Sequence, residues 1–349
     1  MRSGKPGALA IRHHGGNLNA ARCAFPDAPE PWIDLSTGIN PVPYPVGAVS
    51  RAAWTRLPEA SAHDALEAAA RRAYGARASA GIVAAAGSQA LIQWLPRIFP
   101  ARRVGVLGVT YQEHETCWRA AGADVVTVPA LADLAGFDVG VVVNPNNPDG
   151  RICAADDLAN MARILARRGG RLIVDEAFMD VLDWRAGLIP RLPDAGAMVL
   201  RSLGKAYGLA GVRLGFAVAC GDDSARIQAA LGPWPVSGPA LEIGARALAD
   251  EAWLCEAVQR LRNEAARLDR LLQTVGFEIV GGTPLFRLAC HEAADGWFRH
   301  LCRAGILTRP FQARPDWLRF GIPHAAGDWA RLETALRAMK PDCKDISVL

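Results

Sequence analysis

Between residues 63 and 219, short and largely apolar runs alternate with stretches in which apolar residues recur every three or four positions. The runs are four to six residues long and predict buried strands at 82–85, 103–107, 124–128, 140–144, 172–175, 198–202 and 214–219. Helical periodicity lies between several of them, for example over residues 63–74, 114–121 and 154–168. Strands separated by helices predict an α/β fold with a mostly parallel, seven-stranded sheet that is covered on both faces.

The pattern changes after Pro239. A long helical stretch, residues 241–275, precedes shorter units, which are strands at 277–280, 286–288 and 317–320 and helices at 293–304 and 328–339. The first 50 residues have little periodicity and hold six prolines between positions 26 and 45, as is typical of an irregular segment. We therefore expect an N-terminal arm (residues 1–50), a large domain (51–238) and a smaller C-terminal α+β domain (239–349).

The composition excludes several classes of protein. With 51% hydrophobic and 21% charged residues the chain is typical of a folded globular protein. No apolar run approaches the ~20 residues that cross a bilayer, and the N-terminus lacks a secretory signal, so we expect a cytoplasmic protein without a membrane partner. A net charge of +4 with scattered basic residues does not indicate nucleic-acid binding. The eight cysteines show no zinc-ligand spacing, so no metal site is predicted.

Lysine is rare in this chain. Of the 39 basic residues only four are lysines, which leaves 35 arginines, and Lys205 is the only lysine between residues 6 and 339. A neutral amine can attack a carbonyl and form a Schiff base, whereas a guanidinium stays protonated and cannot. The count alone is equally compatible with a lysine retained by chance.

Polar residues follow the predicted strands at their carboxyl ends, where ligands bind in open α/β sheets. Gly87-Ser88-Gln89 ends one strand and opens a helix, whose free amide groups suit a phosphate. Three more sites follow the same rule, residues 144–150, Asp175-Glu176 and residues 202–205, and Arg213 directly precedes a further predicted strand. Each alone has an ordinary reading as a turn, loop, helix cap or surface charge. Their order around the one interior lysine points to a cofactor site.

These motifs together resemble the signature of the fold-type I aminotransferases, which are pyridoxal phosphate (PLP) enzymes, and especially the histidinol-phosphate aminotransferase group. The matching segments are Asn147-Pro148-x-Gly150, Val174-Asp175-Glu176-Ala177, Ser202-Leu203-x-Lys205, Gly208-Leu209-Ala210-Gly211 and Arg213-Leu214-Gly215. The resemblance covers nearly the whole chain. It implies the fold-type I architecture, PLP as the cofactor and a homodimer with shared active sites.

The resemblance also implies the roles of the residues that hold the cofactor. Lys205 would bind PLP as a Schiff base and move protons at the substrate Cα, and Asp175 would pair with the pyridinium nitrogen and keep the ring electron-withdrawing. The other cofactor contacts implied are Asn147 at the ring hydroxyl, Tyr111 stacked on the ring, and Ser88, Gln89, Ser202 and Arg213 at the phosphate.

The N-terminal arm indicates a particular branch of the family. His14-Gly15-Gly16-Asn17 with Asp34-Leu35-Ser36-Thr37-Gly38-Ile39-Asn40-Pro41 is similar to the start of the decarboxylases that convert L-threonine O-3-phosphate to (R)-1-amino-2-propanol O-2-phosphate and CO2 in cobalamin biosynthesis. This implies that the arm contributes to the active site and that the substrate is a small phosphorylated amino acid. Phe178 fits as well, because many aminotransferases have tyrosine there.

The substrate contacts follow from the same resemblance. Arg319, in Trp317-Leu318-Arg319-Phe320, matches the arginine that binds the substrate carboxylate through two hydrogen bonds. The candidates for the substrate phosphate are His14, Asn17, Asn40 and Arg309. One departure from the family is Leu57-Pro58, because related enzymes usually have Tyr-Pro, with a tyrosine that reaches the cofactor phosphate across the dimer interface.

Other reactions and protein classes share part of this pattern of residues. Decarboxylation and transamination differ in which Cα bond stands perpendicular to the PLP plane, so the cofactor motifs are the same and a histidinol-phosphate-type aminotransferase is the runner-up. A non-catalytic PLP-binding regulator would carry an added DNA-binding segment, and no basic helix-turn-helix pattern precedes residue 60. A P-loop is excluded by Val199 and Ala206, and a Rossmann dehydrogenase by the lack of G-x-G-x-x-G after an early strand.

Overall fold

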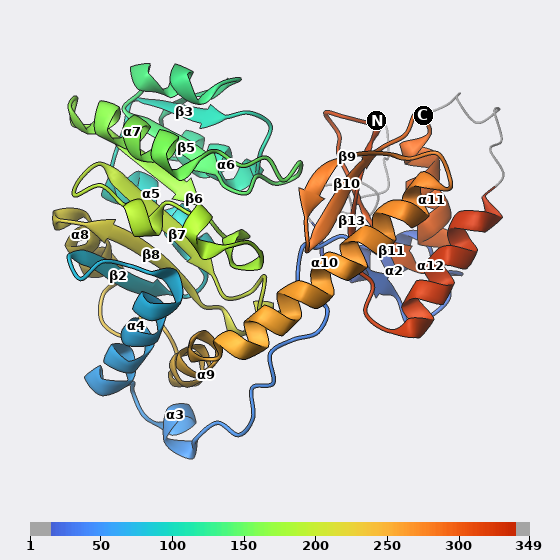
Figure 1. Ribbon diagram of the computed structural model, residues 1–349, viewed down its shortest axis with the longest axis horizontal. Helices are drawn as coiled ribbons and strands as arrows, with labels where there is room; N and C mark the ends of the chain where they lie inside the picture. Colours follow the sequence, from blue (N-terminus) through green and yellow to red (C-terminus); the bar gives the residue numbers. More distant parts are fainter. Residues whose placement is uncertain (1–14, 340–349) are drawn as a thin grey trace, which may run out of the picture. The chain divides into compact units, whose positions relative to one another are not determined.

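The computed structural model describes residues 15–339 and divides into two compact units (Figure 1). Unit 1 combines the chain up to Val42 with the chain from Gln259 onward, and unit 2 comprises Pro43–Val258. The units differ from the domain bounds expected from the sequence for two reasons. Strand β1 (Ile33–Asp34) pairs in parallel with β11 (Ile306–Leu307), which places the N-terminal segment in unit 1. Helix α9 (Gly238–Ala249) packs on α4 (Ala60–Tyr74), which keeps it in unit 2.

A seven-stranded sheet forms the centre of unit 2. Its strand order is β2 (Ala80–Ala85), β8 (Gly215–Cys220), β7 (Ala197–Ser202), β6 (Arg171–Asp175), β5 (Val139–Val143), β3 (Arg103–Leu107) and β4 (Asp124–Val128). Strand β8 is antiparallel to both of its neighbours and all other pairs are parallel. The predicted mostly parallel sheet is confirmed, and every strand lies within two residues of its predicted ends.

The sheet is the centre of a continuous apolar core. Strands β5, β7 and β8 are buried along their whole length, as their unbroken apolar runs predict for strands covered on both faces. Leu91 and Leu95 of α5 (Ser88–Ile98) and Trp118 of α6 (Gln112–Ala120) pack into this core. Each such buried side chain stabilises the fold by about 1.5–3 kcal/mol. The strand ends are therefore a rigid platform for the residues that follow them.

The remaining elements of unit 2 cover the sheet or connect its strands. Helix α7 (Ala155–Ala166) packs on β6 and β7, and α8 (Asp222–Leu231) packs on β2 and β8. The short elements are α3 (Arg51–Thr55), η1 (Leu131–Gly136), η2 (Met179–Val181), η3 (Trp184–Ala186), η4 (Ile189–Arg191) and η5 (Ala210–Val212).

The prediction of one long helix over residues 241–275 is wrong. The structure has two helices, α9 and α10 (Glu251–Gln273), and Asp250 between them leaves the helical conformation at φ −95° and ψ 72°. The Asp250 carboxylate accepts a hydrogen bond from the Trp253 amide at 3.0 Å. A short acidic side chain that caps the next helix in this way competes with the continuation of the previous one.

Unit 1 contains a four-stranded antiparallel sheet, in agreement with the predicted α+β character of the C-terminal part. Its order is β12 (Arg309–Pro310), β13 (Trp317–Gly321), β10 (Phe286–Cys290) and β9 (Glu278–Thr283). Its helices are α2 (Leu18–Ala24), α11 (Ala294–Arg303) and α12 (Ala326–Ala338). Arg309 and Arg319 are register partners on neighbouring strands, so two guanidinium side chains begin side by side.

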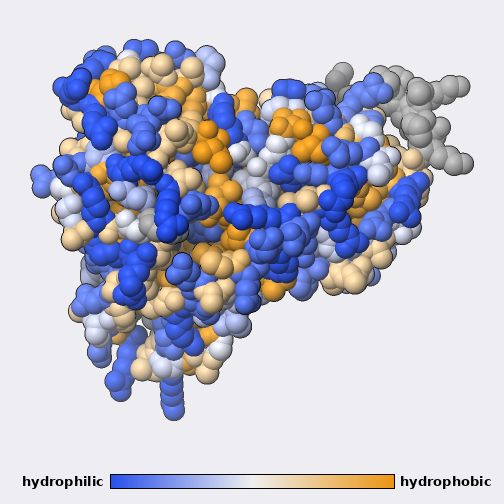
Figure 2. Space-filling view, in the orientation of Figure 1, coloured by the Kyte–Doolittle hydropathy of each residue, from blue (hydrophilic) through white to orange (hydrophobic). Residues whose placement is uncertain are grey.

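The surface is a mosaic of hydrophilic and hydrophobic residues, with hydrophilic ones predominating on the face drawn in Figure 2. None of the helices in residues 15–339 is both long enough and apolar enough to span a bilayer.

Candidate functional site

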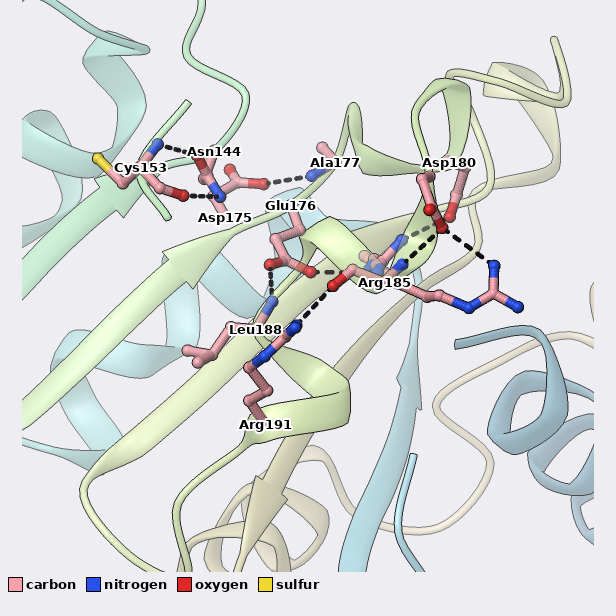
Figure 3. Close-up of polar contacts among 11 residues, drawn as sticks. Asn144, Cys153, Asp175, Glu176, Ala177, Asp180, Arg185, Leu188 and Arg191 are labelled. Carbon is pink, nitrogen blue, oxygen red and sulfur yellow. Dashed lines mark hydrogen bonds and ion pairs between the residues drawn. The ribbon is translucent and has the colours of Figure 1, made fainter. Parts of the chain in front are cut away.

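The predicted cofactor residues of unit 2 gather at the carboxyl edge of its sheet. Asp175 is the last residue of β6 and Ser202 is the last residue of the neighbouring strand β7. The loop after β5 lies beside them, because the main-chain amide of Asn144 donates to the Asp175 carbonyl at 2.8 Å. In Figure 3 the Asn144 side chain also bonds to the main chain of Cys153, farther along this loop. Polar side chains at the ends of three neighbouring parallel strands thus lie at one edge of the sheet, as expected from the binding of ligands at the carboxyl ends of strands in open α/β sheets.

Asp175 is a buried carboxylate with fixed partners. Only 4% of the residue is exposed, and its Oδ1 accepts from the Ala177 amide at 3.1 Å. Its Oδ2 lies 2.9 Å from Nε2 of His114, a residue of α6 that is 1% exposed. Both oxygens are therefore oriented by the protein, as a buried charge requires. The sequence analysis did not select His114. The available signal was its place three residues after Tyr111, one helical turn along α6.

Lys205 occupies the turn that follows β7. It is half-buried, and its Nζ lies 5.3 Å from the centroid of the Phe178 ring. Phe178 belongs to the segment that follows β6, three residues after Asp175. The interior lysine and the buried acid therefore follow neighbouring strands, with an apolar ring against the amine.

A cationic cradle forms where α5 begins. Gly87, at φ +84°, precedes the helix, and a Cβ atom on it would come within 2.8 Å of Nη2 of Arg213. A Cβ on Gly215 would come within 2.3 Å of the Ser88 amide nitrogen, and Gly215 is the register partner of Ser202. Close backbone approach thus brings Ser88, Ser202 and Arg213 together at a helix N-terminus. This combination of amides, hydroxyls and guanidinium suits a phosphate.

Tyr111 and Gln89 contact each other. The Tyr111 hydroxyl donates to Gln89 Oε1 at 3.1 Å, and Gln89 Nε2 donates to Glu113 Oε2 at 3.0 Å. The Tyr111 ring meets the His114 ring edge-on, with centroids 6.2 Å apart. Gln89 therefore orients the aromatic side chain, which lies beside the pair formed by His114 and Asp175.

Asn147 lies in the loop after β5 and is half-buried. Its neighbour Asn146 fixes this loop, because Asn146 Nδ2 donates to the Val109 carbonyl at 3.0 Å and Asn146 Oδ1 accepts from the Thr110 hydroxyl at 2.6 Å. The loop that carries Asn147 is thereby attached to the segment that carries Tyr111.

A buried ionic cluster lies directly behind these strand ends. Arg201, the residue before Ser202, has no exposed surface. Its Nη2 lies 3.1 Å from Glu176 Oε2, and its Nη1 lies 2.6 Å from Asp180 Oδ1. Glu176 Oε1 also accepts from the Leu188 amide at 2.6 Å (Figure 3). Burial raises the pKa of both carboxyl groups, and the guanidinium opposes this shift. The sequence analysis did not identify this cluster.

The predicted substrate residues lie in unit 1. Arg319 is 6% exposed, and its Nη2 donates to the Ser36 carbonyl at 2.8 Å. Burial, and next the neighbouring Arg309 guanidinium, lower the pKa of Arg319 to about 9. A bound carboxylate would offset both effects, so the position suits an anion.

The other predicted substrate residues have structural partners. Asn17 caps α2, with Oδ1 accepting from the Ala20 amide at 3.1 Å. Asn40 is 2% exposed, and its Oδ1 accepts from the Val42 amide at 3.0 Å and from Arg260 Nη2 at 3.1 Å. His14 lies outside the described residues. The predicted residues thus fall into two sets, with the cofactor set in unit 2 and Asn17, Asn40, Arg309 and Arg319 in unit 1.

The cofactor set fits PLP chemically. An amine can bind the cofactor's aldehyde, a buried carboxylate can pair with a ring nitrogen, and a cationic cradle can hold a phosphate. A ring-shaped cofactor also needs an aromatic or apolar face, which Tyr111 and Phe178 supply. In the part of the chain that the structure describes, no group of three or more His, Cys, Asp or Glu side chains is arranged to hold a metal ion.

Comparison with known proteins gives matches along most of the chain. The family model "Aminotransferase class I and II" matches residues 30–339. The chain is 42% identical to the threonine-phosphate decarboxylase of Pseudomonas aeruginosa, over 94% of this chain and 98% of that protein. It is also 42% identical to the threonine-phosphate decarboxylase of a Sinorhizobium species, with the same shares covered.

Solved structures show the same fold. The histidinol-phosphate aminotransferase from Sinorhizobium meliloti in complex with pyridoxal-5'-phosphate matches with a TM-score of 0.78 and 21% identity, over 96% of this chain and 97% of that one. The L-threonine-O-3-phosphate decarboxylase from Porphyromonas gingivalis matches with a TM-score of 0.70 and 19% identity, over 87% and 98%. The predicted fold-type I architecture is confirmed.

Proposed function

Because the chain belongs to the class I and II aminotransferase family, we propose that it is a PLP-dependent lyase that decarboxylates L-threonine O-3-phosphate. The products are (R)-1-amino-2-propanol O-2-phosphate and CO2, and the amino alcohol phosphate is used in cobalamin biosynthesis. The observation that carries this proposal is the 42% identity to two curated threonine-phosphate decarboxylases, which extends over 94% of the chain.

The residues at the carboxyl edge of the unit 2 sheet hold the cofactor. When bound, PLP accepts the electron pair that is left when a bond at the substrate Cα breaks. Lys205 Nζ is the covalent attachment point for the cofactor's carbonyl carbon and afterwards the group that moves a proton at Cα. The Asp175 carboxylate stabilises a proton on the ring nitrogen, and His114 and the Ala177 amide keep that carboxylate oriented.

The cradle at the start of α5 binds the cofactor phosphate. Ser88 and Ser202 offer hydroxyl groups, the first turn of α5 offers amide groups, and Arg213 offers a positive charge. Tyr111, whose hydroxyl is held by Gln89, would lie against the ring, and Asn147 would donate to the ring hydroxyl. Gln89 thus acts on the cofactor through Tyr111.

Substrate anions are bound by the arginines of unit 1. Arg319 binds the carboxylate, and the substrate phosphate is bound among Arg309, Asn17, Asn40 and His14. Decarboxylation breaks the bond between Cα and the carboxylate carbon, releases CO2 and places a proton on Cα, so no second substrate is needed. The residue that binds the carboxylate therefore determines which reaction occurs, because it sets the direction of the bond between Cα and the carboxylate carbon.

The reaction takes place in the cytoplasm, in a homodimer whose two subunits share their active sites. Trp54 and Leu57 have relative exposures of 67% and 64%, and large apolar side chains exposed this close together in sequence are typical of an interaction surface. Leu57 provides no hydroxyl, so either another group replaces the tyrosine's hydrogen bond to the cofactor phosphate or the cofactor is bound less tightly. The dimer is tested by sedimentation of the purified protein, with Trp54→Ser and Leu57→Ser as variants.

A histidinol-phosphate-type aminotransferase is the second candidate. It is favoured by the likeness to the S. meliloti structure, with a TM-score of 0.78, and by 34% identity to a Mycobacterium tuberculosis histidinol-phosphate aminotransferase over 60% of this chain. That reaction needs an amino acceptor, which distinguishes it from decarboxylation.

Two parallel incubations test the proposal. Purified protein with PLP receives L-threonine O-3-phosphate in one tube, and histidinol phosphate with 2-oxoglutarate in the other. We expect CO2 and aminopropanol phosphate in the first tube only, and no CO2 with Lys205→Ala. Glutamate in the second tube without CO2 in the first would establish the aminotransferase instead.

A further inference from the structure

An arginine-lined groove lies in unit 2 away from the cofactor residues. It has a volume of about 590 Å³ and is lined by Arg77, Arg163, Arg167 and Arg191, with Asp194 as the one acidic lining residue. The groove residues lie in the last turns of α7, just before β7 or just before β2, whose first residue is at the same edge as the start of β7. They are therefore at the amino edge of the sheet, whereas Asp175 and Ser202 end their strands at the carboxyl edge. With ~3.3 Å per strand residue, the two edges are roughly 15–20 Å apart.

Two of the four arginines are held in place by main-chain oxygens. Arg77 Nη2 donates to the Leu192 carbonyl and also to Asp194 Oδ1 at 3.0 Å. Arg191 Nη1 donates to the Arg185 carbonyl at 2.6 Å (Figure 3). These bonds fix the two guanidinium groups and leave other N–H groups of each to bind an anion. Less conformational entropy is then lost on binding.

The other two arginines face them from the end of α7. Among the described residues, the side chain of neither Arg163 nor Arg167 forms an ion pair or hydrogen bond. They stand four residues apart, so their like charges repel each other on one helix face. Ala166 lies between them, and the chain leading into β7 crosses tightly over it, since a Cβ on Gly196 would come within 2.5 Å of the Ala166 Cβ.

The charges in the groove do not balance. Four guanidinium groups are opposed by Asp194, which is paired with Arg77, and by Asp156, which is paired with Arg191 at 3.1 Å. Two positive charges remain. Both carboxylates are also widely exposed, at 88% and 85% of their side chains, so solvent weakens their attraction for the arginines.

The preference for a cation at the negative, C-terminal end of a helix explains only part of this arrangement. One cation complements the negative end of α7, and Arg168 fulfils that role outside the groove, where its Nη1 donates to the Ala135 carbonyl at 2.7 Å. Two further unpaired arginines on the same turn, facing two anchored ones, are not needed for that purpose. A bound dianion would relieve the repulsion.

We propose that this groove is a binding site for a small molecule that carries a phosphate ester. Guanidinium groups bind phosphate oxygens in pairs, and two uncompensated charges match a phosphate dianion. The volume exceeds what a bare phosphate fills and lies in the range of small-molecule sites, so the ligand has an organic part. The groove shares no residue with the cofactor and substrate sets, and its occupancy is measurable without turnover.

Calorimetric titration of the holoenzyme tests this proposal, with ADP, glycerol 3-phosphate and adenosine as probes. We expect binding of the two phosphate esters and none of adenosine. Equal affinity of the two esters would identify the phosphate as the recognised group, and tighter binding of ADP would identify a nucleotide site. Thermal melting should rise with ester concentration in the same order.

Single arginine variants at the end of α7 test the groove, and one of them is a matched control. Arg163→Gln and Arg167→Gln should each weaken binding about tenfold, because each removes charge-assisted hydrogen bonds. Arg168→Gln removes the same charge from the next residue, outside the groove, and should change affinity less than about twofold. Equal losses in all three variants, affinity unchanged by Arg163→Gln and Arg167→Gln, or no heat with either ester up to millimolar concentration would overturn the proposal.

Discussion

His114 Nε2 and Asp175 Oδ2 lie 2.9 Å apart, and both residues are almost completely buried. The contact joins helix α6 to the end of strand β6, which are 61 residues apart along the chain. A buried carboxylate is costly unless its oxygens are hydrogen-bonded, so His114, together with the Ala177 amide, stabilises Asp175 in a fixed direction. The acid that we propose pairs with the cofactor ring is therefore oriented by a residue from another element.

His114→Ala should lower kcat by about tenfold or more, because a hydrogen bond to a buried charge contributes about 1.5–3 kcal/mol. His114→Gln should restore part of the loss, since its amide can still donate to Asp175. The measurement is steady-state decarboxylation with saturating PLP. His300→Ala is the matched control, because His300 lies in unit 1, where it contacts the Ala335 carbonyl and the Trp297 ring, and its loss should leave kcat unchanged. Equal kcat for wild type and His114→Ala would contradict the positioning role.

Asp175→Asn should reduce kcat by about a hundredfold or more, because the amide has the same shape but cannot stabilise a proton on the ring nitrogen, and a buried charge pair is worth several kcal/mol. The absorbance of the bound cofactor, followed from pH 5 to 9, reports the ring's protonation and should change with the variant. Asp183→Asn, an exposed carboxylate close along the chain, serves as the control. A kcat within twofold of wild type would show that Asp175 has another role.

Arg319→Lys should raise the KM for L-threonine phosphate by about tenfold, with the cofactor spectrum unchanged. Lysine keeps the positive charge but loses the planar pair of donors that binds a carboxylate. Arg287→Lys, on the neighbouring strand β10 and paired with Asp269 at 2.6 Å, is the control. An effect on kcat alone, with no change in KM, would argue against carboxylate binding by Arg319.

Arg201→Met should destabilise the fold by about 3–5 kcal/mol, because Glu176 and Asp180 would remain buried without their cation. Urea denaturation of the protein measures the loss. Arg299→Met removes an exposed pair with Asp295 and should cost less than about 1 kcal/mol. Similar losses in the two variants would mean that the buried cluster contributes no more than a surface ion pair.

Asp316 should make the free energy of unfolding depend on pH in the acid range. Hydrogen bonds from Arg314, at 3.0 and 2.7 Å, lower the pKa of Asp316 from 3.8 to about 2. A lowered carboxyl pKa contributes stability that is present above pH 3.8 and lost as the pH falls through about 2. NMR titration should give this pKa for Asp316 and a higher pKa in Arg314→Gln. A wild-type pKa near 3.8 would contradict the prediction.

Much of the fold and of the cofactor site follows from local patterns. The unbroken apolar runs of β5, β7 and β8 are what a doubly covered strand requires, and the strand-end rule placed Asp175, Ser202 and Lys205 at one edge.

The remaining features depend on partners distant in sequence. The one local signal for His114 is its place three residues after Tyr111, and its partner Asp175 is 61 residues away. Arg201 interrupts an apolar strand for reasons visible only once Glu176 and Asp180 are in place. Strands β1 and β11 have two residues each, too few for a periodic signal. The break at Asp250 was missed because a polar residue between alanine and glutamate also fits an exposed helix face.

The central claim is that this chain decarboxylates L-threonine O-3-phosphate with PLP and without an amino acceptor. The most direct test supplies substrate labelled with carbon-13 in the carboxyl group, in the absence of 2-oxoglutarate, and follows the label and the organic phosphate by NMR. The account predicts labelled CO2 in equal amount to aminopropanol phosphate, with both absent in Lys205→Ala. Label retained in an organic acid, with turnover that begins only after 2-oxoglutarate is added, would contradict it.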